Sequence, residues 1–592
     1  MKENIFCLII DALSFPYMND KYNAMPFLKS LQNSGHNCLN MYSQGPYTEA
    51  ALTPFYTGRD NMDFGGNFFR GQQTPLTTFE AFRNDGFNVI NYTQPLIYPK
   101  PMSRGINQER YGVCYFFAAV WDYRLSYFAE LNKSGKLTEK DYDEIYELVE
   151  TNFEFWLIYF NKCKNSADEA DFINLYSDRN FDFDKCIKEV SYQFSKYSEN
   201  KQKYIDNIFK LGKKHEIFSI ENYFMNSKAE NPGLYKEIAD KYSALFKKIS
   251  NFNRKHNKSK DYSVLSLLKI CSKLIAGKKS DALNCAKKYH YYKKIYSTKS
   301  ELKKLFELKS NYKPEPSILN YFGHFCNWYN KRKGKDKSFY CTMHVSDLHT
   351  PEIFFSIDAE NISQVKNELD IAESFLDSLP SDFSGNVIYY LSMRYVDYCI
   401  EKMFCTLKNM GLTDNTLFVI TADHGSSFGF RPVRTSLVNN EHDENYHIPC
   451  VIYGKNVLHN DDERFYTTKD IVKTILEYSN INNPVFTGKN ILDLSHKNEY
   501  AITEYLGAGC PDISRRPLFF VIRDVNYCIG MKQYVTEEFS VDNIFCVYDR
   551  KNDVSENVNI KNSVDIIQLD FLINKLQLRF NEIQGDYYAN KT

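Results

Sequence analysis

The segment TLFVITADHG, residues 416–425, decides the fold that we expect for this chain. Its apolar run Thr416–Thr421 has the length of a buried strand, and an acid, an imidazole and a glycine follow almost at once. In open parallel sheets, functional groups gather where strands end and loops begin. Carboxylate oxygens and imidazole nitrogens are common ligands of divalent cations, so Asp423 and His424 are candidate metal ligands. The alternative is a polar turn whose groups are satisfied locally.

Two other apolar runs end in the same kind of residue. Ile5–Ile10 is followed directly by Asp11, which could bind a hard metal ion or could cap the next helix. Ser338–Val345 leads into a segment that contains Asp347 and His349. If that segment is extended, both side chains point to one face and could bind a metal or a phosphoryl oxygen. The alternative for the pair is a surface turn.

Thr48 lies between a turn and a helix. Gly45 and Pro46 set the turn, and a good helix-forming run follows Thr48, so we expect Thr48 at the N-cap. A threonine in that place is usually only a cap. However, its hydroxyl also faces free backbone N–H groups and the positive end of the helix dipole, which suits the binding of an oxyanion. A metal ion on the hydroxyl would make it a usable nucleophile.

Changes in composition and in hydrophobic spacing divide the chain into a core and two additional regions. Residues 1–115 and 316–480 alternate strand and helix patterns, which is typical of an α/β core with a mixed, mainly parallel sheet. Residues 116–315 are rich in Lys, Glu, Tyr, Phe and Leu at helical spacing, and we interpret them as a large helical insertion. Its later half is basic, which indicates a solvated helix face or a docking surface for an acidic substrate. Residues 481–592 predict a small C-terminal α+β subdomain.

Individual elements follow from the same periodicities. The further strands expected are Asn88–Tyr92, Pro449–Tyr453, Ala501–Tyr505, Leu518–Arg523, Tyr527–Met531 and Phe545–Tyr548. The helices expected are Ala24–Gly35, Asp141–Phe160, Asp184–Leu211, Val264–Lys278 and Ile388–Met410.

Composition excludes some classes of partner. The formal net charge of −1 gives no reason to expect nucleic acid or an anionic membrane as a partner. No apolar run is long enough to span a membrane. The start MKENIFCLIIDALSF has too short an apolar run for a signal peptide, and the 15 cysteines are scattered singly. We therefore expect a cytoplasmic protein with reduced thiols, although export by an unusual route would leave no such mark.

The order of these segments resembles the sulfatase-like branch of the alkaline phosphatase superfamily. Members of that family have an acid after the first strand, and then a phrase that AMPFLKSLQNSG (residues 24–35) resembles. Their nucleophile stands nine residues before a Thr-Gly pair, as Thr48 stands before Thr57-Gly58. The segment His344–Pro351 is similar to the family phrase H-x-x-D-x-H-x-P, and Tyr446–Pro449 to a later family phrase. Tyr395–Gly425 is the closest match.

The resemblance implies a set of roles for the residues of the site. Asp11, Thr48, Asp423 and His424 would hold a divalent cation, which could be Zn, Mn, Ca or Mg. Asp347, His349 and His447 would bind a second metal ion, or would hydrogen-bond the ester and protonate the leaving group. Thr48, His349 and His447 are the candidate catalytic residues, and Arg59 and His344 the candidate substrate-binding residues.

The nucleophile phrase departs from that of sulfatases proper, which have Cys or Ser in a Cys-x-Pro-x-Arg phrase that is converted to formylglycine. Here the phrase is Thr48-Glu-Ala-Ala-Leu52, so that conversion cannot occur, and the usual acid pair is reduced to Asp11-Ala12. A Thr nucleophile with one acid is more similar to relatives that form a phospho-threonine intermediate. We therefore expect a hydrolase or transferase of phosphate esters.

Several alternatives remain open. The chain could be a sulfuric ester hydrolase, a non-catalytic binding protein that kept the fold, or a mutase or scaffold whose insertion docks another protein. The partner expected is an anionic ester, which could be glycan-linked or nucleotide-linked.

Overall fold

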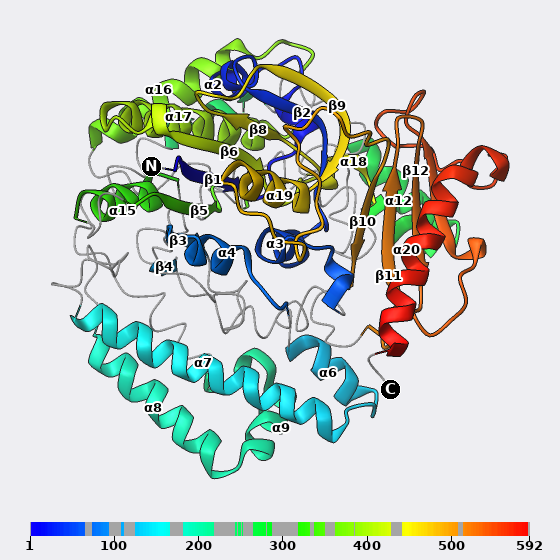
Figure 1. The fold of residues 1–592 in the computed structure, drawn as a ribbon. Coiled ribbons are helices and arrows are strands. Elements are labelled where there is room, and N and C mark those ends of the chain that lie inside the picture. The colour runs from blue at the N-terminus through cyan, green and yellow to red at the C-terminus, as the bar shows by residue number, and fades with distance from the viewer. Residues whose placement is uncertain are drawn as a thin grey trace.

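The computed structural model describes residues 2–64, 74–93, 108–111, 125–165, 182–217, 243–245, 247–249, 251–252, 264–279, 281–283, 285–286, 318–331, 337–349, 362–383, 385–427, 441–506 and 513–589. In this part of the chain a nine-stranded sheet forms the centre of the molecule (Figure 1). Its order is β4 (Gln108–Tyr111), β3 (Asn88–Thr93), β5 (Phe339–Val345), β1 (Asn4–Ile10), β6 (Thr416–Ala422), β8 (Cys450–Tyr453), β2 (His36–Tyr42) and β7 (His447–Ile448), with β9 (Asn460–Thr467) also paired to β2.

The sheet is mixed and mainly parallel, as the sequence predicted. Strands β4, β3, β5, β1 and β6 pair in parallel, and β9 is parallel to β2. Antiparallel pairing occurs where β8 joins β6 and β2, and where β7 joins β2. This is the α/β architecture expected from the sulfatase-like resemblance.

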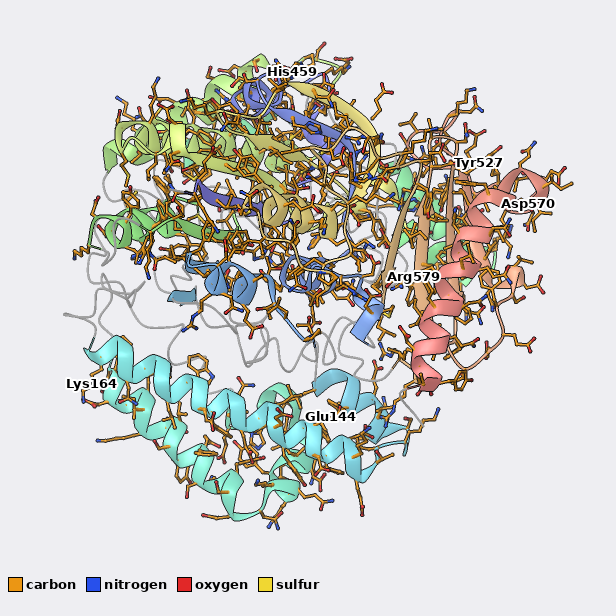
Figure 2. The ribbon with its side chains drawn as sticks, in the orientation of Figure 1. Glu144, Lys164, His459, Tyr527, Asp570 and Arg579 are labelled. Atoms are coloured by element: carbon orange, nitrogen blue, oxygen red, sulfur yellow. The ribbon has the colours of Figure 1, made fainter. Side chains whose placement is uncertain are left out.

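Helices cover both faces of this sheet, which is why its middle strands are apolar throughout. One layer contains α2 (Pro26–Gln32), α15 (Ile318–Lys331), α16 (Ile362–Ser378) and α17 (Val387–Asn409), and the other contains α3 (Thr48–Thr57), α4 (Thr78–Asn84) and α19 (Thr468–Tyr478). Aromatic side chains fill both layers: Phe6 meets Phe325 edge to face at 5.2 Å, and Tyr340 stacks on Phe82 at 4.1 Å. Figure 2 shows this dense packing of side chains around the sheet.

Strands β2 and β9 were not predicted, because their sequences are polar. The structure pairs those polar groups with each other across the two strands. His36 Nε2 lies 3.0 Å from Asp462 Oδ2, and the Asn37 side chain donates to Asp461 Oδ1 at 2.8 Å. Polar residues that satisfy one another in this way need no apolar alternation, so the pattern rule could not find these strands.

A second, antiparallel sheet follows in the C-terminal part of the chain. It contains β10 (Ala501–Tyr505), β11 (Leu518–Arg523), β12 (Tyr527–Gln533) and β13 (Ile544–Asp549), which lie in this order. All four predicted strands are confirmed to within two residues. Helix α20 (Asp570–Ala589) packs on this sheet through contacts such as Phe520 with Phe580.

Helices dominate the described parts of residues 116–315. They include α6 (Ser126–Lys133), α7 (Glu139–Asn165), α8 (Phe183–Glu199), α9 (Lys201–Leu211) and α12 (Val264–Ile275). The expected single segment Asp184–Leu211 is two helices, because Asn200 leaves the helical conformation and its side chain caps α9 by accepting the Lys203 N–H. The basic segments 254–260 and 287–304 lie outside the described residues. None of the described helices is long and apolar enough to cross a membrane.

Candidate active site and metal centre

The register of the central strands brings two aspartates together. In β1, Ile10 lies beside Val345 of β5 on one side and Ala422 of β6 on the other. The next residues of β1 and β6 are Asp11 and Asp423, so both carboxylates emerge at the same edge of the sheet. The Asp11 backbone N–H still donates to Val345 O at 2.9 Å, which fixes the start of the loop. Both aspartates are almost completely buried.

The turn after β1 has an uncommon backbone conformation. Ala12 has φ of 62°, in the left-handed region that residues other than glycine seldom adopt. Its N–H donates to Asp423 Oδ1 at 3.1 Å, and its carbonyl accepts the hydroxyl of Tyr389 at 2.7 Å. The same hydroxyl accepts the Ser14 N–H at 3.1 Å. These bonds hold the strained turn against β6 and α17, and with it the position of Asp11.

Thr48 lies at the start of α3, one position later than expected. Tyr47 is the N-cap residue and Thr48 is the first residue of the helix. The Thr48 side chain is therefore not used as the cap, and its Oγ1 lies 3.3 Å from His424 Nε2. Thr48 is partly exposed, so a substrate in solution could reach this hydroxyl.

His424 is held so that one ring nitrogen faces Thr48 and the aspartates. Its Nδ1 lies 2.7 Å from Gly425 O, and because a carbonyl only accepts, Nδ1 carries the proton in this contact. In the neutral ring, Nε2 then presents a lone pair. The turn also requires glycine at position 425, since a Cβ there would lie 2.1 Å from Glu444 O.

Three donor atoms converge at this point. His424 Nε2 lies 3.5 Å from Asp11 Oδ1 and 3.6 Å from Asp423 Oδ2. One ligand atom from each of the three residues lies within 4.8 Å of the other two. Asp11 Oδ1 is buried and has no hydrogen-bond partner among the described residues. The carboxylates of Asp11 and Asp423 and the lone pair of His424 face one another, and one carboxylate oxygen is buried and unsatisfied. This arrangement fits a divalent cation.

The charges of the site shift the pKa values of the aspartates in opposite directions. Burial raises the pKa of Asp11, and the charge of Asp423 raises it further, against the effects of His349, His424 and His344. Burial also acts to raise the pKa of Asp423, but His424 and the hydrogen bond from His344 hold that pKa below its usual range. An added positive charge at this point would therefore favour the anionic form of both carboxylates.

His344 lies beneath the aspartates and does not face solvent. It is 1% exposed, and its Nε2 lies 3.3 Å from Asp423 Oδ2 and 3.7 Å from Asp11 Oδ2. Burial lowers the pKa of His344, but the contact with Asp423 outweighs burial, and the net shift is upward. In this position His344 supports the aspartates, whereas the resemblance had implied contact with substrate.

Asp347 and His349 point to different places, because the segment between them is a turn. The His349 N–H donates to Ser346 O at 3.0 Å, so the segment is not extended and the expected common face does not exist. Asp347 accepts the Ile318 N–H at 3.0 Å, at the start of α15. His349 is near enough for its charge to lower the pKa of Asp11. Thr350 and Pro351 of the predicted phrase lie outside the described residues.

The structure does not bring His447 to the three metal-ligand candidates. Its Nδ1 lies 2.8 Å from Asp443 Oδ2, and its Nε2 lies 2.8 Å from Leu39 O. The ring also stacks between Phe15 and Tyr42, at 4.5 Å and 4.8 Å. With both nitrogens engaged, the ring in this arrangement offers no atom to a metal ion or a leaving group.

Arg59 also lies away from Thr48, because it follows the opposite end of α3. Its Nε donates to Asp63 at 2.6 Å and its Nη1 donates to Val485 O at 3.1 Å. These contacts place the side chain in a charged network with the C-terminal part of the chain. The predicted contact of Arg59 with substrate stays a prediction that this geometry does not favour.

The sequence analysis missed a buried network behind His447. The Glu556 carboxylate accepts the Asp443 N–H at 2.7 Å, and the fully buried Arg523 lies 3.5 Å from Glu556 and 3.7 Å from Asp443. Burial raises the pKa of Glu556 to about 7. No sequence signal could have found this network, since its members come from distant segments and match no pattern.

Comparisons with known proteins find a similarity to the sulfatase family. The model of the sulfatase family matches residues 280–481. No curated protein matches the chain. Among solved structures, the phosphonate monoester hydrolase of Agrobacterium radiobacter is 12% identical, covers 98% of this chain and 96% of its own, and superposes with a TM-score of 0.48. The putative sulfatase yidJ from Bacteroides fragilis is 12% identical, with coverage of 100% and 97% and a TM-score of 0.48.

These two structures are too distant to say anything about substrate or mechanism. The family match is more informative, because it contains β5, β6 and the turn that holds Asp423 and His424. Asp11 and Thr48 lie before the matched range, and the fold brings them to that turn. The resemblance seen in the sequence is thus confirmed over this range: residues 280–481 of the chain match the sulfatase family model.

Proposed function

We propose that this protein is a metal-dependent enzyme that hydrolyses or transfers a phosphate ester through a covalent phospho-Thr48 intermediate. One observation carries the proposal: Thr48 Oγ1 lies 3.3 Å from His424 Nε2, directly beside the three converging ligand atoms of Asp11, Asp423 and His424. These residues come from three distant segments of the chain. A hydroxyl at the start of a helix, beside a candidate metal site and open to solvent, is suited to nucleophilic attack.

Asp11, Asp423 and His424 would hold the cation, together with the Thr48 hydroxyl. Two carboxylate oxygens and an imidazole nitrogen suit zinc and are also compatible with manganese, calcium or magnesium. When bound, a divalent cation lowers the pKa of the hydroxyl and neutralises charge on the ester. His344 supports this set from below, through its contacts with both aspartates.

The remaining steps belong to residues of the chain. Thr48 Oγ1 loses its proton to water and attacks phosphorus in line, the bond from phosphorus to the leaving oxygen breaks, and the phosphoryl group stays on Thr48. Because Thr48 is the first residue of α3, the first N–H groups of that helix would stabilise the charge on the ester oxygens. His349, the predicted proton donor whose charge is felt at Asp11, would protonate the leaving oxygen. Water or an acceptor hydroxyl then attacks the phospho-threonine and frees Thr48.

Sulfate-ester hydrolysis is the second candidate, because the family model that matches the chain is that of the sulfatases. Phosphorus is favoured over sulfur because a threonine cannot be converted to formylglycine. A non-catalytic binding protein is disfavoured, since nothing in a binding role requires a hydroxyl beside the metal-ligand candidates. We further propose that the ester is carried by a glycan or a nucleotide.

Mass spectrometry of the peptide that contains Thr48 tests the proposal. The protein is incubated briefly with para-nitrophenyl phosphate, bis(para-nitrophenyl) phosphate or para-nitrophenyl sulfate and then quenched. We expect an added phosphoryl group on Thr48 from para-nitrophenyl phosphate, an added para-nitrophenyl phosphoryl group from bis(para-nitrophenyl) phosphate, and neither in Thr48→Ala. Thr53→Ala is the matched control, because Thr53 lies on the same helix and its hydroxyl donates to Glu49 O at 2.9 Å. A Thr48→Ala protein with full activity on all three esters would refute the mechanism.

A further inference from the structure

A cavity of about 530 Å³ lies outside the candidate active site. Its walls come from the start of α19, from the segment 487–502 that leads into β10, and from α20. None of Asp11, Thr48, Asp423 and His424 lines it. We call it the α19–α20 pocket. Its lining contains five lysine and arginine side chains, so the question is which of these charges are already neutralised.

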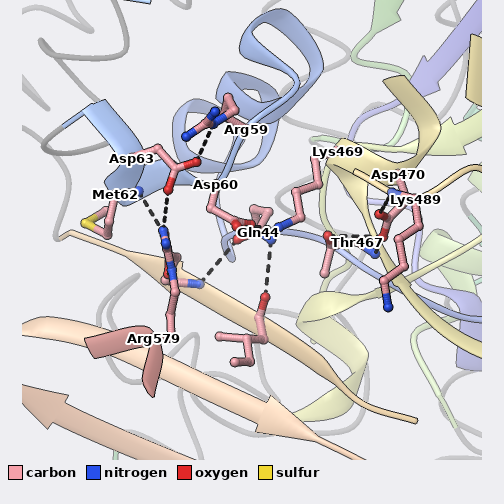
Figure 3. A network of polar contacts seen from close by, with 12 residues as sticks. Gln44, Arg59, Asp60, Met62, Asp63, Thr467, Lys469, Asp470, Lys489 and Arg579 are labelled. Carbon is pink, nitrogen blue, oxygen red and sulfur yellow. Dashed lines mark hydrogen bonds and ion pairs between the residues drawn. The ribbon is translucent and has the colours of Figure 1, made fainter. Parts of the chain in front are cut away.

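The deepest charges of the α19–α20 pocket neutralise one another. Lys469 pairs with Asp60, and Arg579 holds both carboxylate oxygens of Glu504, at 2.6 Å and 2.8 Å (Figure 3). The side chain of Arg579 reaches this network from the face of α20 that is turned towards the rest of the molecule (Figure 2). The carboxylate of Asp470 accepts backbone N–H groups at the start of α19 and at position 489. Asp63 bridges Arg579 and Arg59, so this floor holds four carboxylates against three cations and offers no free positive charge to an anion.

Two lysines of the α19–α20 pocket are held by neutral groups instead. The Lys489 ammonium donates to the side-chain carbonyl of Asn498 and, at 3.4 Å, to Lys497 O. The Lys575 ammonium lies 5.5 Å from the ring centroids of both Tyr500 and Phe571. Amide carbonyls and aromatic faces fix an ammonium group in place without cancelling its charge. Within the described residues neither ammonium group has a carboxylate partner, so both could bind an anion.

The neutral partners place both lysines on the same pocket. Asn498 and Tyr500, which hold them, are two residues apart in the chain, and both line the cavity. The rings of Tyr500 and Phe571 meet edge to face at 5.7 Å and offer a flat apolar surface beside Lys575. Glu499 is an exposed acid of the lining, and it forms no ion pair in the described residues. One unpaired acid therefore accompanies these two lysines in the lining.

We propose that the α19–α20 pocket binds a small phosphate or sulfate ester carried on a ring compound such as a sugar. Lys489 and Lys575 would bind the oxyanion through charge-assisted hydrogen bonds, and Tyr500 and Phe571 would contact the ring. This site is distinct from the one at Thr48 and does not depend on the function proposed above. It would serve a second anionic group of an extended substrate, or a separate anionic ester.

Isothermal titration of the full-length Thr48→Ala protein tests the proposal, with released phosphate and sulfate assayed alongside so that any turnover is detected. The probes are the phosphate monoester of glucose, its sulfate monoester, and glucose itself. We expect both esters to bind and glucose to bind much more weakly. Lys489→Gln and Lys575→Gln, each added to Thr48→Ala, should lower the affinity for the esters about tenfold or more. Lys551→Gln is the matched control, since Lys551 is exposed and does not line the pocket.

Each outcome decides the matter. Absence of binding by either ester, or equal affinities in all the lysine variants, would overturn the proposal. Loss of binding in an Asp11→Asn, Thr48→Ala double variant, with no effect of the lysines, would assign the binding to the active site and would also overturn it. Lysine-dependent binding of only one ester would keep the pocket and identify its group as phosphate or sulfate. Failure to label Thr48 with a phosphoryl group would leave all these results unchanged.

Discussion

Replacing Asp11 by asparagine should stabilise the metal-free protein and abolish its stabilisation by metal. Asp11 is 2% exposed, and its buried Oδ1 has no hydrogen-bond partner in the part of the chain that the structure describes. The same carboxylate faces Asp423, whose charge helps to raise the pKa of Asp11. Asparagine keeps the shape, removes the repulsion, and can turn its NH₂ group towards the lone pair of His424 Nε2. A buried unsatisfied polar group costs about 1–3 kcal/mol, so the free energy of unfolding should rise by about that amount.

Added metal should make the wild-type protein more stable than Asp11→Asn. A cation that binds only the native state stabilises it by about 2.7 kcal/mol at a hundred times its Kd. The wild-type protein would gain this and Asp11→Asn would not, because the substitution removes a ligand. Thermal unfolding with a chelator, and then with excess Zn²⁺, Mn²⁺, Ca²⁺ or Mg²⁺, measures both effects on the same samples.

Asp397→Asn is the matched control for this experiment. Asp397 is also buried, but its carboxylate accepts the N–H groups of Phe27 and Leu28, at 3.0 Å and 2.8 Å, and the Arg394 guanidinium at 3.0 Å. Its replacement should destabilise the protein with and without metal. A lower stability of the metal-free protein in Asp11→Asn, or a wild-type protein that none of the four cations stabilises, would contradict this prediction.

Three further substitutions test other contacts of the site. Gly425→Ala should displace the turn that holds the imidazole, because its Cβ would lie 2.1 Å from Glu444 O, and should lower kcat at least a hundredfold, whereas Gly585→Ala, with open space around it, should not. Tyr389→Phe removes the hydroxyl that joins two backbone groups of the turn after β1, and should cost about 1–3 kcal/mol of unfolding free energy and about tenfold in metal affinity, measured by denaturation and titration. Glu556 has a pKa of about 7 in the folded protein against an ordinary 4.5, so the native state binds its proton more tightly and stability should fall by about 3 kcal/mol as pH rises from 5 to 8. Glu556→Gln should remove that slope in pH-dependent unfolding, and parallel slopes for the two proteins would contradict this assignment.

Much of the fold could be predicted because its signals are local. The apolar runs that became β1, β5 and β6, and the helical spacing that became α7 and α17, are properties of neighbouring residues. Such patterns decide which residues are buried in an element regardless of the rest of the chain. The polar strands β2 and β9 were missed because their stability depends on pairing with each other, which no local pattern records.

The site was predictable in part for the same reason. The sequence by itself determined which residues could carry the chemistry: acids and an imidazole directly after buried strands, and a hydroxyl at the start of a helix. Parallel pairing then necessarily gathers the ends of those strands at one edge of the sheet. This is why Asp11, Asp423 and His424 converge, with Thr48 beside them, although up to several hundred residues separate them.

Only the tertiary structure decided which candidates share that point. Three other candidates are chemically as suitable, but each contacts a different partner. Asp347 accepts a hydrogen bond at the start of α15, His447 contacts Asp443, and Arg59 pairs with Asp63. The α19–α20 pocket likewise arises where two segments meet that are distant in the sequence. The physical reason is that a side chain's partner depends on packing between distant elements and on small rotations of the backbone, such as the turn at residues 347–349. A sequence pattern records what a residue can do, and three-dimensional packing selects what it contacts.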